Sequence, residues 1–152
     1  MATILGYSFP DELYYHPRYM VWIASEERDG AIEIRLGLSA LVLATAGELL
    51  VFAGRPLGAT IDCDRAIGNV ETAKTVSSVR TPVAGRIIAV NEVVEANGEL
   101  INKDPYAAWL VRLAATDWPR DQGRLLRGDA AAQAIEAELQ LYRVNADNPH
   151  ND

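Results

Sequence analysis

The sequence predicts a mainly β protein, built as a flattened barrel or sandwich with a short internal helix and a C-terminal helix. Short segments rich in strand-forming residues follow one another closely through the middle of the chain, and such spacing is typical of barrels and sandwiches. Segments 38–47 and 129–144 instead carry helical patterns. At 152 residues, of which 49% are hydrophobic, the chain is long enough to bury one core.

The first two expected strands, 19–24 and 31–36, form a hairpin. In the second strand, isoleucine and leucine alternate with charged residues, as in a strand with one buried face. Asp29 and Gly30 lie between the strands. They are the pair that a tight two-residue turn prefers, because both of its central positions take positive φ angles.

After this hairpin we expect a short amphipathic helix over 38–47, with Ser39 near its start and Gly47 at its end. Strand-like segments then follow in close succession, at 49–53, 59–62, 69–73, 75–79, 86–90 and 109–114. Strands this short and this closely spaced indicate two sheets that both contribute to the core.

Pro119 closes the β region, since proline cannot continue a central strand. A polar loop leads from it to the C-terminal helix over 129–144, which is rich in strong helix formers. Ile135, Leu139 and Tyr142 share one face of this helix, so we expect the helix to pack back on the sheets.

Composition and charge exclude several classes of protein. The formal net charge is −7 and the basic residues do not cluster, so neither nucleic acid nor an anionic membrane surface is an expected partner. The N-terminus has no basic n-region, and no apolar run reaches the length of a membrane span. Cys63 is the only cysteine, which excludes an internal disulfide and fits a reducing cytoplasm.

The residues that most catalytic sites need are missing. Cys63 and two histidines, His16 and His150, are too few and too distant in sequence for a metal site. A catalytic triad would have to use His16, which precedes Pro17 in an aromatic stretch and is better interpreted as a packing residue. No glycine-rich phosphate-binding loop is present. We therefore expect neither a metal nor an intrinsic enzymatic activity.

Lys74 is one of only two lysines, beside twelve arginines, and it lies between two strand-like segments. Its small neighbours, Ala73 and Thr75, favour a hairpin tip that holds the amine in solvent. Unlike arginine, lysine has a primary amine that can be acylated, with loss of its charge. Lys74 is therefore either an ordinary turn lysine or a site of covalent modification.

Four strings follow one another between residues 67 and 113: VETAKTVSSV, TPVAG, AVNEVVEANGELINKDPY and WLVRL. They resemble the lipoyl-carrying core of the glycine cleavage system H protein family. That family has Glu-Ser-Val-Lys-Ala, Pro-Val-Ser-Gly, Val-Asn-Glu and Asn-x-Asp-Pro-Tyr ahead of a tryptophan strand, in the same order and spacing. The resemblance extends weakly over residues 14–62 and implies a lipoyl-domain-like fold, a barrel-sandwich hybrid.

By this resemblance Lys74 is the residue that carries lipoate, the expected cofactor. The amide bond would be made by a lipoate-protein ligase or a lipoyl transferase. Glu71 occupies the position that the family uses for recognition by the attaching enzyme. Gly58 and Gly85 align with family glycines that shape the surface around the hairpin, and we expect them to contribute to this recognition.

The sequence pattern and the resemblance together lead us to expect a division of the chain. Residues 1–118 would form the lipoyl-carrier domain, with the hairpin tip at Lys74. Residues 119–146 would form a C-terminal loop and helix that pack on it, and 147–152 a frayed tail. A monomer is the expected state of such a mobile carrier.

The family members serve different pathways, and this sequence departs from the glycine cleavage pattern at HPRYMVWI (16–23), at LSALVLATAG (38–47) and at Ala107-Ala108-Trp109. These changes favour an H-like lipoate-binding protein of bacterial sulfur oxidation, which would carry sulfur-bound intermediates and have a heterodisulfide-reductase-like complex as partner. The alternative is the orthodox H protein. It would carry the aminomethyl group between glycine decarboxylase and aminomethyltransferase, with dihydrolipoamide dehydrogenase as the reoxidising enzyme.

Related carriers fit less well. Biotin-carrying domains place methionine on both sides of the lysine, where this chain has Ala73 and Thr75. Lipoyl domains of the 2-oxo-acid dehydrogenases have aspartate immediately before it. Two other classes stay open: a binding module that is not lipoylated, and an enzyme that uses Lys74 as a Schiff-base amine. The polar surroundings of Lys74 argue against the enzyme, which needs a desolvated amine.

Overall fold

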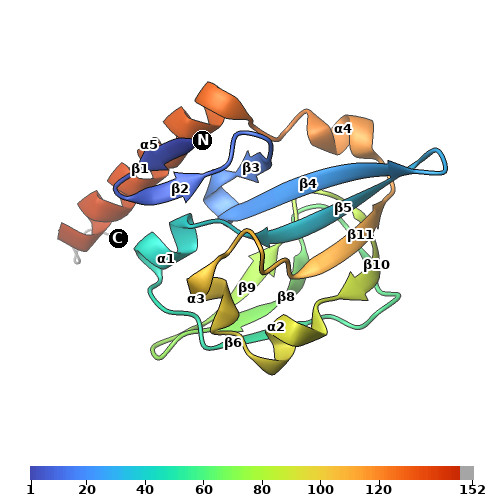
Figure 1. The fold of residues 1–152 in the computed structure, drawn as a ribbon, viewed down its shortest axis with the longest axis horizontal. Helices are drawn as coiled ribbons and strands as arrows, with labels where there is room; N and C mark the ends of the chain where they lie inside the picture. Colours follow the sequence, from blue (N-terminus) through green and yellow to red (C-terminus); the bar gives the residue numbers. More distant parts are fainter. Residues whose placement is uncertain (148–152) are drawn as a thin grey trace.

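The computed structural model describes residues 1–147, with side chains over 1–143, and shows three antiparallel sheets, of which the two larger pack face to face (Figure 1). The larger has six strands in the order β3 (Tyr14–His16), β4 (Val21–Arg28), β5 (Ala31–Leu38), β11 (Val111–Ala115), β10 (Gly85–Val90) and β7 (Thr60–Ile61). The smaller has three, in the order β6 (Val51–Gly54), β8 (Ala66–Glu71) and β9 (Val76–Arg80). The predicted mainly β, lipoyl-domain-like fold is confirmed, as a flattened sandwich rather than a closed barrel.

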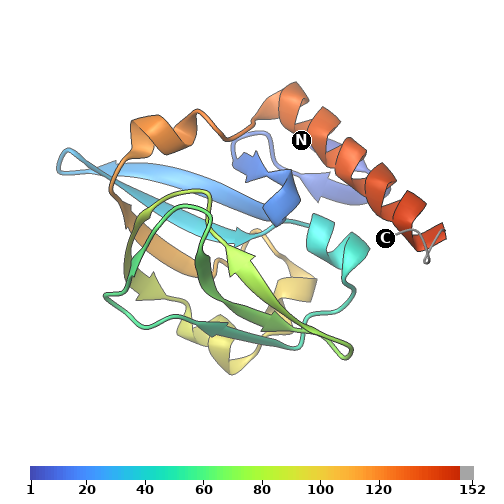
Figure 2. The ribbon, with the colours of Figure 1, turned by 180° about the vertical axis from the view of Figure 1, so that it is seen from behind.

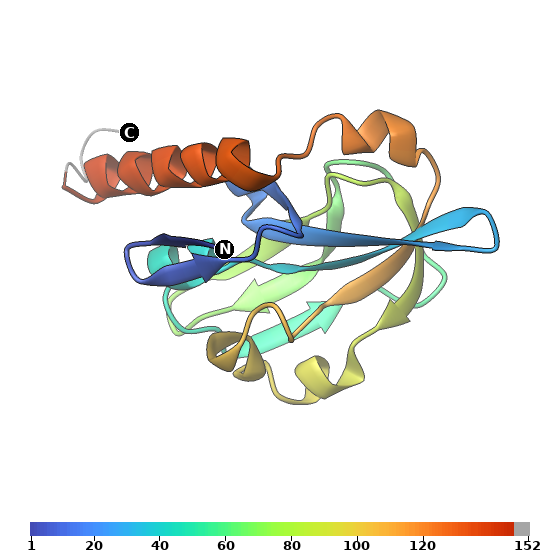
Figure 3. The ribbon, with the colours of Figure 1, turned by 45° about the horizontal axis from the view of Figure 1, so that its top comes forward.

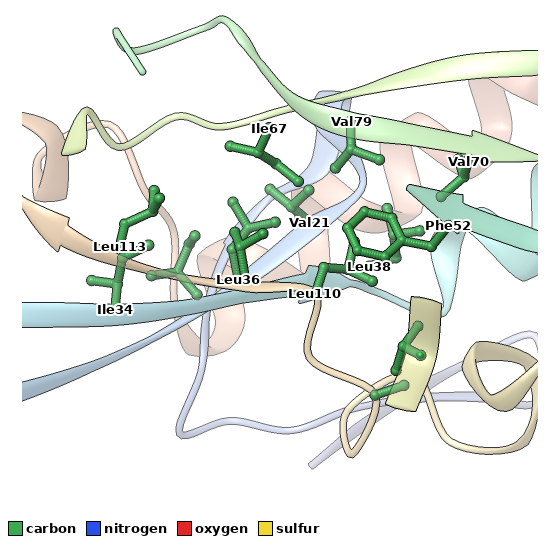
Figure 4. Close-up of a cluster of buried hydrophobic side chains, with 14 of the residues drawn as sticks. Val21, Ile34, Leu36, Leu38, Phe52, Ile67, Val70, Val79, Leu110 and Leu113 are labelled. Carbon is green, nitrogen blue, oxygen red and sulfur yellow. The ribbon is translucent and has the colours of Figure 1, made fainter. Parts of the chain in front are cut away.

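Apolar side chains from the inner faces of both sheets form the main core (Figure 4). Leu36 and Leu113 come from the six-stranded sheet, and Phe52, Val70 and Val79 from the three-stranded sheet. Val70 and Val79 are buried while Glu71 and Val76 at the ends of the same strands are exposed. The three-stranded sheet therefore turns one face to the core and the other to solvent.

The hairpin of β4 and β5 is confirmed. Its turn consists of Asp29 (φ 52°) and Gly30 (φ 80°), both in the left-handed region, as the sequence predicts. The strands continue further than expected, however, and pair over eight positions from Val21 with Leu38 to Arg28 with Ala31.

This pairing shortens the predicted helix over 38–47. Leu38 still belongs to β5, so α1 covers only Leu41–Thr45. The Thr45 hydroxyl donates to the Leu41 carbonyl (2.8 Å), which satisfies it inside the helix. Gly47 follows with a φ of 82°, as expected of a helix stop.

Short helices between the strands were not predicted. They are the 3₁₀ helix η1 (Pro17–Tyr19), α2 (Glu92–Ala96), α3 (Leu100–Lys103) and α4 (Trp118–Gln122). Three begin with a side-chain cap: His16 accepts from the Tyr19 amide at η1, Asn91 from the Val93 amide at α2, and Asp117 from the Arg120 amide at α4. None of the helices within residues 1–147 combines the length and the apolar character that crossing a membrane requires.

The C-terminal helix α5 (Gly128–Asp147) packs on the N-terminal part of the chain (Figure 3). With the hairpin of β1 (Ala2–Ile4) and β2 (Tyr7–Phe9) it forms a second apolar cluster, to which it contributes Ile135 and Leu139. Tyr142 remains 43% exposed. Helix formation and packing follow the prediction, but the contacts are with β1, β3, η1 and α1. Of the expected tail over 147–152, all but Asp147 lies outside the described residues.

Candidate functional site

Strands β8 and β9 form a hairpin whose turn, residues 72–75, projects beyond both sheets (Figure 2). The Thr72 amide donates to the Thr75 carbonyl (2.9 Å) and closes the turn. The Thr72 hydroxyl oxygen accepts from the Lys74 and Thr75 amides, each at 3.3 Å. The backbone around Lys74 is therefore ordered by local hydrogen bonds.

Lys74 lies at the tip of this hairpin with an exposed side chain. Its ammonium group forms no hydrogen bond or ion pair with any residue that the structure describes. Ala73 and Thr75 are exposed as well. The structure thus places the amine in solvent, next to small side chains that leave room for an approaching enzyme.

Glu71 is the last residue of β8 and shares the hairpin with Lys74. It pairs with Val51 of β6 on one side and Val76 of β9 on the other, and all three side chains are exposed. The Glu71 carboxylate has no ion-pair partner among the described residues. A free carboxylate flanked by two exposed valines therefore lies three residues before the lysine.

Gly58 and Gly85 lie elsewhere, at strand β10 of the six-stranded sheet. Gly58 has a φ of 87°, a left-handed conformation, and donates its amide to the Ile87 carbonyl at 2.8 Å. Gly85 is buried in β10, where an added Cβ would come within 2.5 Å of the Ala114 carbonyl oxygen. The structure does not bring either glycine into the hairpin, and backbone geometry accounts for both.

A cavity of about 500 Å³ lies on the inner side of the hairpin. Its walls come from β8, β9, η1, α1 and α5, and include Thr72, Ser77, Met20, Val42 and Tyr142. This volume lies within the range typical of small-molecule sites. Two of these wall segments, within 16–23 and 38–47, are places where the sequence departs from the family pattern, but the sequence does not show that the walls meet, because they come together only in the folded chain.

An ion-pair cluster anchors Tyr19, a residue of the cavity wall. Arg124 donates to both oxygens of Asp64 (2.8 and 3.0 Å), and the Tyr19 hydroxyl donates to the same carboxylate (2.9 Å). The hydrogen bonds from Arg124 lower the pKa of Asp64 to about 2. His16 stacks on Tyr19 at 3.9 Å, and burial, reinforced by the charge of Arg124, lowers its pKa.

The described residues form no cluster that resembles a metal site. Within the part of the chain that the structure describes, no three His, Cys, Asp or Glu residues lie close enough to hold an ion. Cys63 is a half-buried free thiol. His16 accepts the Tyr19 amide hydrogen bond through Nδ1 (3.2 Å), consistent with the packing role expected from the sequence.

Comparison with known proteins identifies the family. The family model described as "Glycine cleavage H-protein" matches residues 13–138. The chain belongs to the glycine cleavage H-protein family. Members of this family carry lipoate bound covalently to a lysine, and they act as carriers within a multienzyme system.

Individual relatives agree over most of the chain. "Glycine cleavage system H protein 5" of Aquifex aeolicus is 30% identical over 143 residues, covering 92% of this chain and 95% of that protein. "Glycine cleavage system H protein" of Bacillus cereus is 33% identical over 111 residues, covering 72% and 84%. The crystal structure of the H protein from Mycobacterium marinum superposes with a TM-score of 0.70 at 28% identity, covering 83% of this chain and 98% of that one.

Proposed function

We propose that this protein is a lipoyl carrier of the glycine cleavage system, with lipoate in amide linkage to Lys74. The observation that carries the proposal is the amine of Lys74, free in solvent at the tip of an ordered hairpin, in a chain of the H-protein family. In this role it takes the aminomethyl group from glycine decarboxylase to aminomethyltransferase, and dihydrolipoamide dehydrogenase is its third partner.

The residues around Lys74 fit a lipoyl group. Acylation of the amine breaks no interaction within the described chain, and the cavity beside Thr72 and Ser77 offers a mainly apolar shelter for a hydrocarbon arm. When bound, the group supplies a dithiol–disulfide pair that can open, hold a cargo and close again. The hairpin positions the attachment nitrogen.

Glu71 supports recognition by the enzyme that attaches lipoate, because its free carboxylate is available for a cation on that enzyme. For Gly58 and Gly85 we propose an indirect contribution, through the packing of β10. We also propose that residues 1–118 form the carrier domain, that 119–146 pack on it, and that the protein acts as a monomer in the cytoplasm.

The choice of pathway depends on the relatives. Those from Aquifex aeolicus and Bacillus cereus are glycine cleavage H proteins by name, and neither name refers to sulfur oxidation. The sulfur-oxidation role and its heterodisulfide-reductase-like partner, which the sequence favours, gain no support from these relatives. Orthodox glycine cleavage is therefore the function proposed.

The test is transfer from the decarboxylase. Lipoylated protein is incubated with glycine decarboxylase and glycine, and its intact mass is measured. We expect the mass increment of the aminomethyl group, in wild type and in Lys103→Arg but not in Lys74→Arg. If the wild type stays unloaded while the Bacillus cereus H protein is loaded in the same mixture, the glycine cleavage role is excluded.

A further inference from the structure

A second hollow lies at the end of the β8–β9 hairpin remote from Lys74, and three arginines line it. It has a volume of about 450 Å³ and lies between β7, the start of β8 and the end of β9. Arg55, Arg65 and Arg80 line it together with one carboxylate, that of Asp62. Because a strand rises about 3.4 Å per residue, Arg80 lies about 17 Å along β9 from the hairpin turn. We call this surface the arginine groove.

No carboxylate neutralises the three arginines of the groove. Within residues 1–143, whose side chains the structure describes, none of them forms an ion pair, whereas five other arginines do. Arg80 donates to the backbone carbonyl of Asp64 (2.8 Å), which is an uncharged acceptor. The Asp62 carboxylate lines the groove without pairing with any of the three. The groove therefore holds three cations and a single anion.

A fourth arginine lies beside the groove. Arg86 of β10 is directly opposite Thr60 of β7, and Thr60 lines the groove. Side chains of directly opposed residues in an antiparallel pair lie on the same face of the sheet. Arg86 is exposed and forms no ion pair within the described side chains. A chain of net charge −7 thus gathers four of its twelve arginines at one edge of the sandwich.

The chemistry of the groove favours a ligand that carries several carboxylates. Ile61 and Ala66 are the only apolar residues that line it, so it offers little to an apolar small molecule. The arginines are exposed, and a single anion gains little from one exposed arginine. A segment with several carboxylates contacts several guanidinium groups at once, and each contact can form two parallel hydrogen bonds.

We propose that the arginine groove is a docking site for an acidic segment of a partner protein. Members of this family act as carriers within a multienzyme system, so their surfaces bind other proteins. The net charge of this chain repels an acidic partner elsewhere and attracts it only at the groove, which fixes the orientation of docking. A long polyanion such as a nucleic acid would extend beyond the groove over the acidic surface. The proposal goes beyond the carrier function and does not depend on lipoylation of Lys74.

The test is a titration of full-length, unlipoylated protein with a labelled hexaglutamate peptide, followed by fluorescence anisotropy at low salt. We expect saturable binding, which the double variant Arg55→Gln/Arg65→Gln weakens about fivefold to tenfold. Arg80 is left unchanged because it also lines the cavity on the inner side of the hairpin. The matched control, Arg35→Gln/Arg143→Gln, changes the net charge equally at two exposed arginines outside the groove. Its dissociation constant should stay within about twofold of wild type.

A variant that strengthens binding keeps the test independent of any damage to the fold. Asp62→Asn removes the one carboxylate of the groove and should tighten peptide binding by about twofold to fivefold. The backbone amide resonances of Thr60 and Ala66, in the groove, should shift when the peptide binds, and that of Thr75 at the hairpin turn should not.

Several outcomes would overturn the proposal. Equal weakening in the two double variants would mean that net charge alone attracts the peptide, and unchanged binding in Asp62→Asn would place the peptide elsewhere. If inorganic phosphate displaces the peptide at a concentration near the dissociation constant of the peptide, the groove binds small anions instead. A short DNA duplex that binds more tightly than the peptide would make the groove a nucleic-acid site. Because the protein is unlipoylated throughout, none of these results bears on the attachment at Lys74.

Discussion

Single residues around the site differ in how far the sequence predicts them. The exposure of Lys74 follows from its small neighbours, Ala73 and Thr75, which cannot cover an amine at a turn. Gly85 lies eleven residues further on, and its environment does not follow from local sequence. Its lack of a side chain is required by Ala114, a residue of a different strand that meets it only across the sheet.

Gly85→Ala should therefore lower the stability of the fold without a direct effect on lipoylation. The added Cβ would meet the Ala114 carbonyl oxygen at 2.5 Å. Such overpacking lowers the free energy of unfolding by about 1–3 kcal/mol. Urea unfolding gives this value. We expect lipoylation kinetics of the folded variant to match those of wild type. A raised KM toward the ligase with unchanged stability would instead make Gly85 a direct recognition residue.

For helices and strands, pairing between strands distant in sequence sets boundaries that local sequence patterns do not predict. The hairpin of β4 and β5 follows from alternation and from Asp29-Gly30, and it is present as predicted. Helix α1 is shorter than its periodicity indicates, because Leu38 pairs with Val21 in the sheet. Helices α2 and α4 begin with side-chain caps, which α3 lacks. In each of these helices of four or five residues the apolar stripe is too short to detect in the sequence.

Helix α5 should be stabilised mainly through its buried face. Ile135 is fully buried in the cluster with β1 and β2, so Ile135→Ala should lower the free energy of unfolding by about 2–5 kcal/mol. Leu141→Ala, at a half-exposed position of the same helix, should change it by less than about 0.5 kcal/mol. Urea denaturation of the two variants provides the comparison. Equal effects would mean that α5 does not pack as described.

The ion-pair cluster between η1 and the C-terminal loop should give stability that depends on pH. Hydrogen bonds from Arg124 hold the pKa of Asp64 at about 2 in the folded protein, below its usual value of 3.8. A lowered carboxyl pKa stabilises the fold above the unfolded value, and this contribution is lost as the pH falls from about 4 toward 2. The urea midpoint of wild type should exceed that of Asp64→Asn at pH 5, and the gap should close by pH 2. Asp62→Asn, which removes an exposed carboxylate outside the cluster, should show no such convergence.

At the scale of the whole molecule, the site combines one feature that the sequence predicts and one that it does not. The lysine hairpin is continuous in sequence and carries the family pattern, so it is predictable. The cavity has walls from η1, α1, β8, β9 and α5, and no local pattern shows that these meet.

The central claim is that the tip of the hairpin is where the carrier arm is attached. Purified apoprotein is incubated with lipoate, ATP and a lipoate-protein ligase, and its intact mass is recorded beside those of Lys74→Arg and Lys103→Arg. Lys103 is the matched control because it is the only other lysine and is also exposed. We predict one lipoyl increment in wild type and in Lys103→Arg, and none in Lys74→Arg. An unmodified wild type, or an increment that persists in Lys74→Arg, would contradict the account.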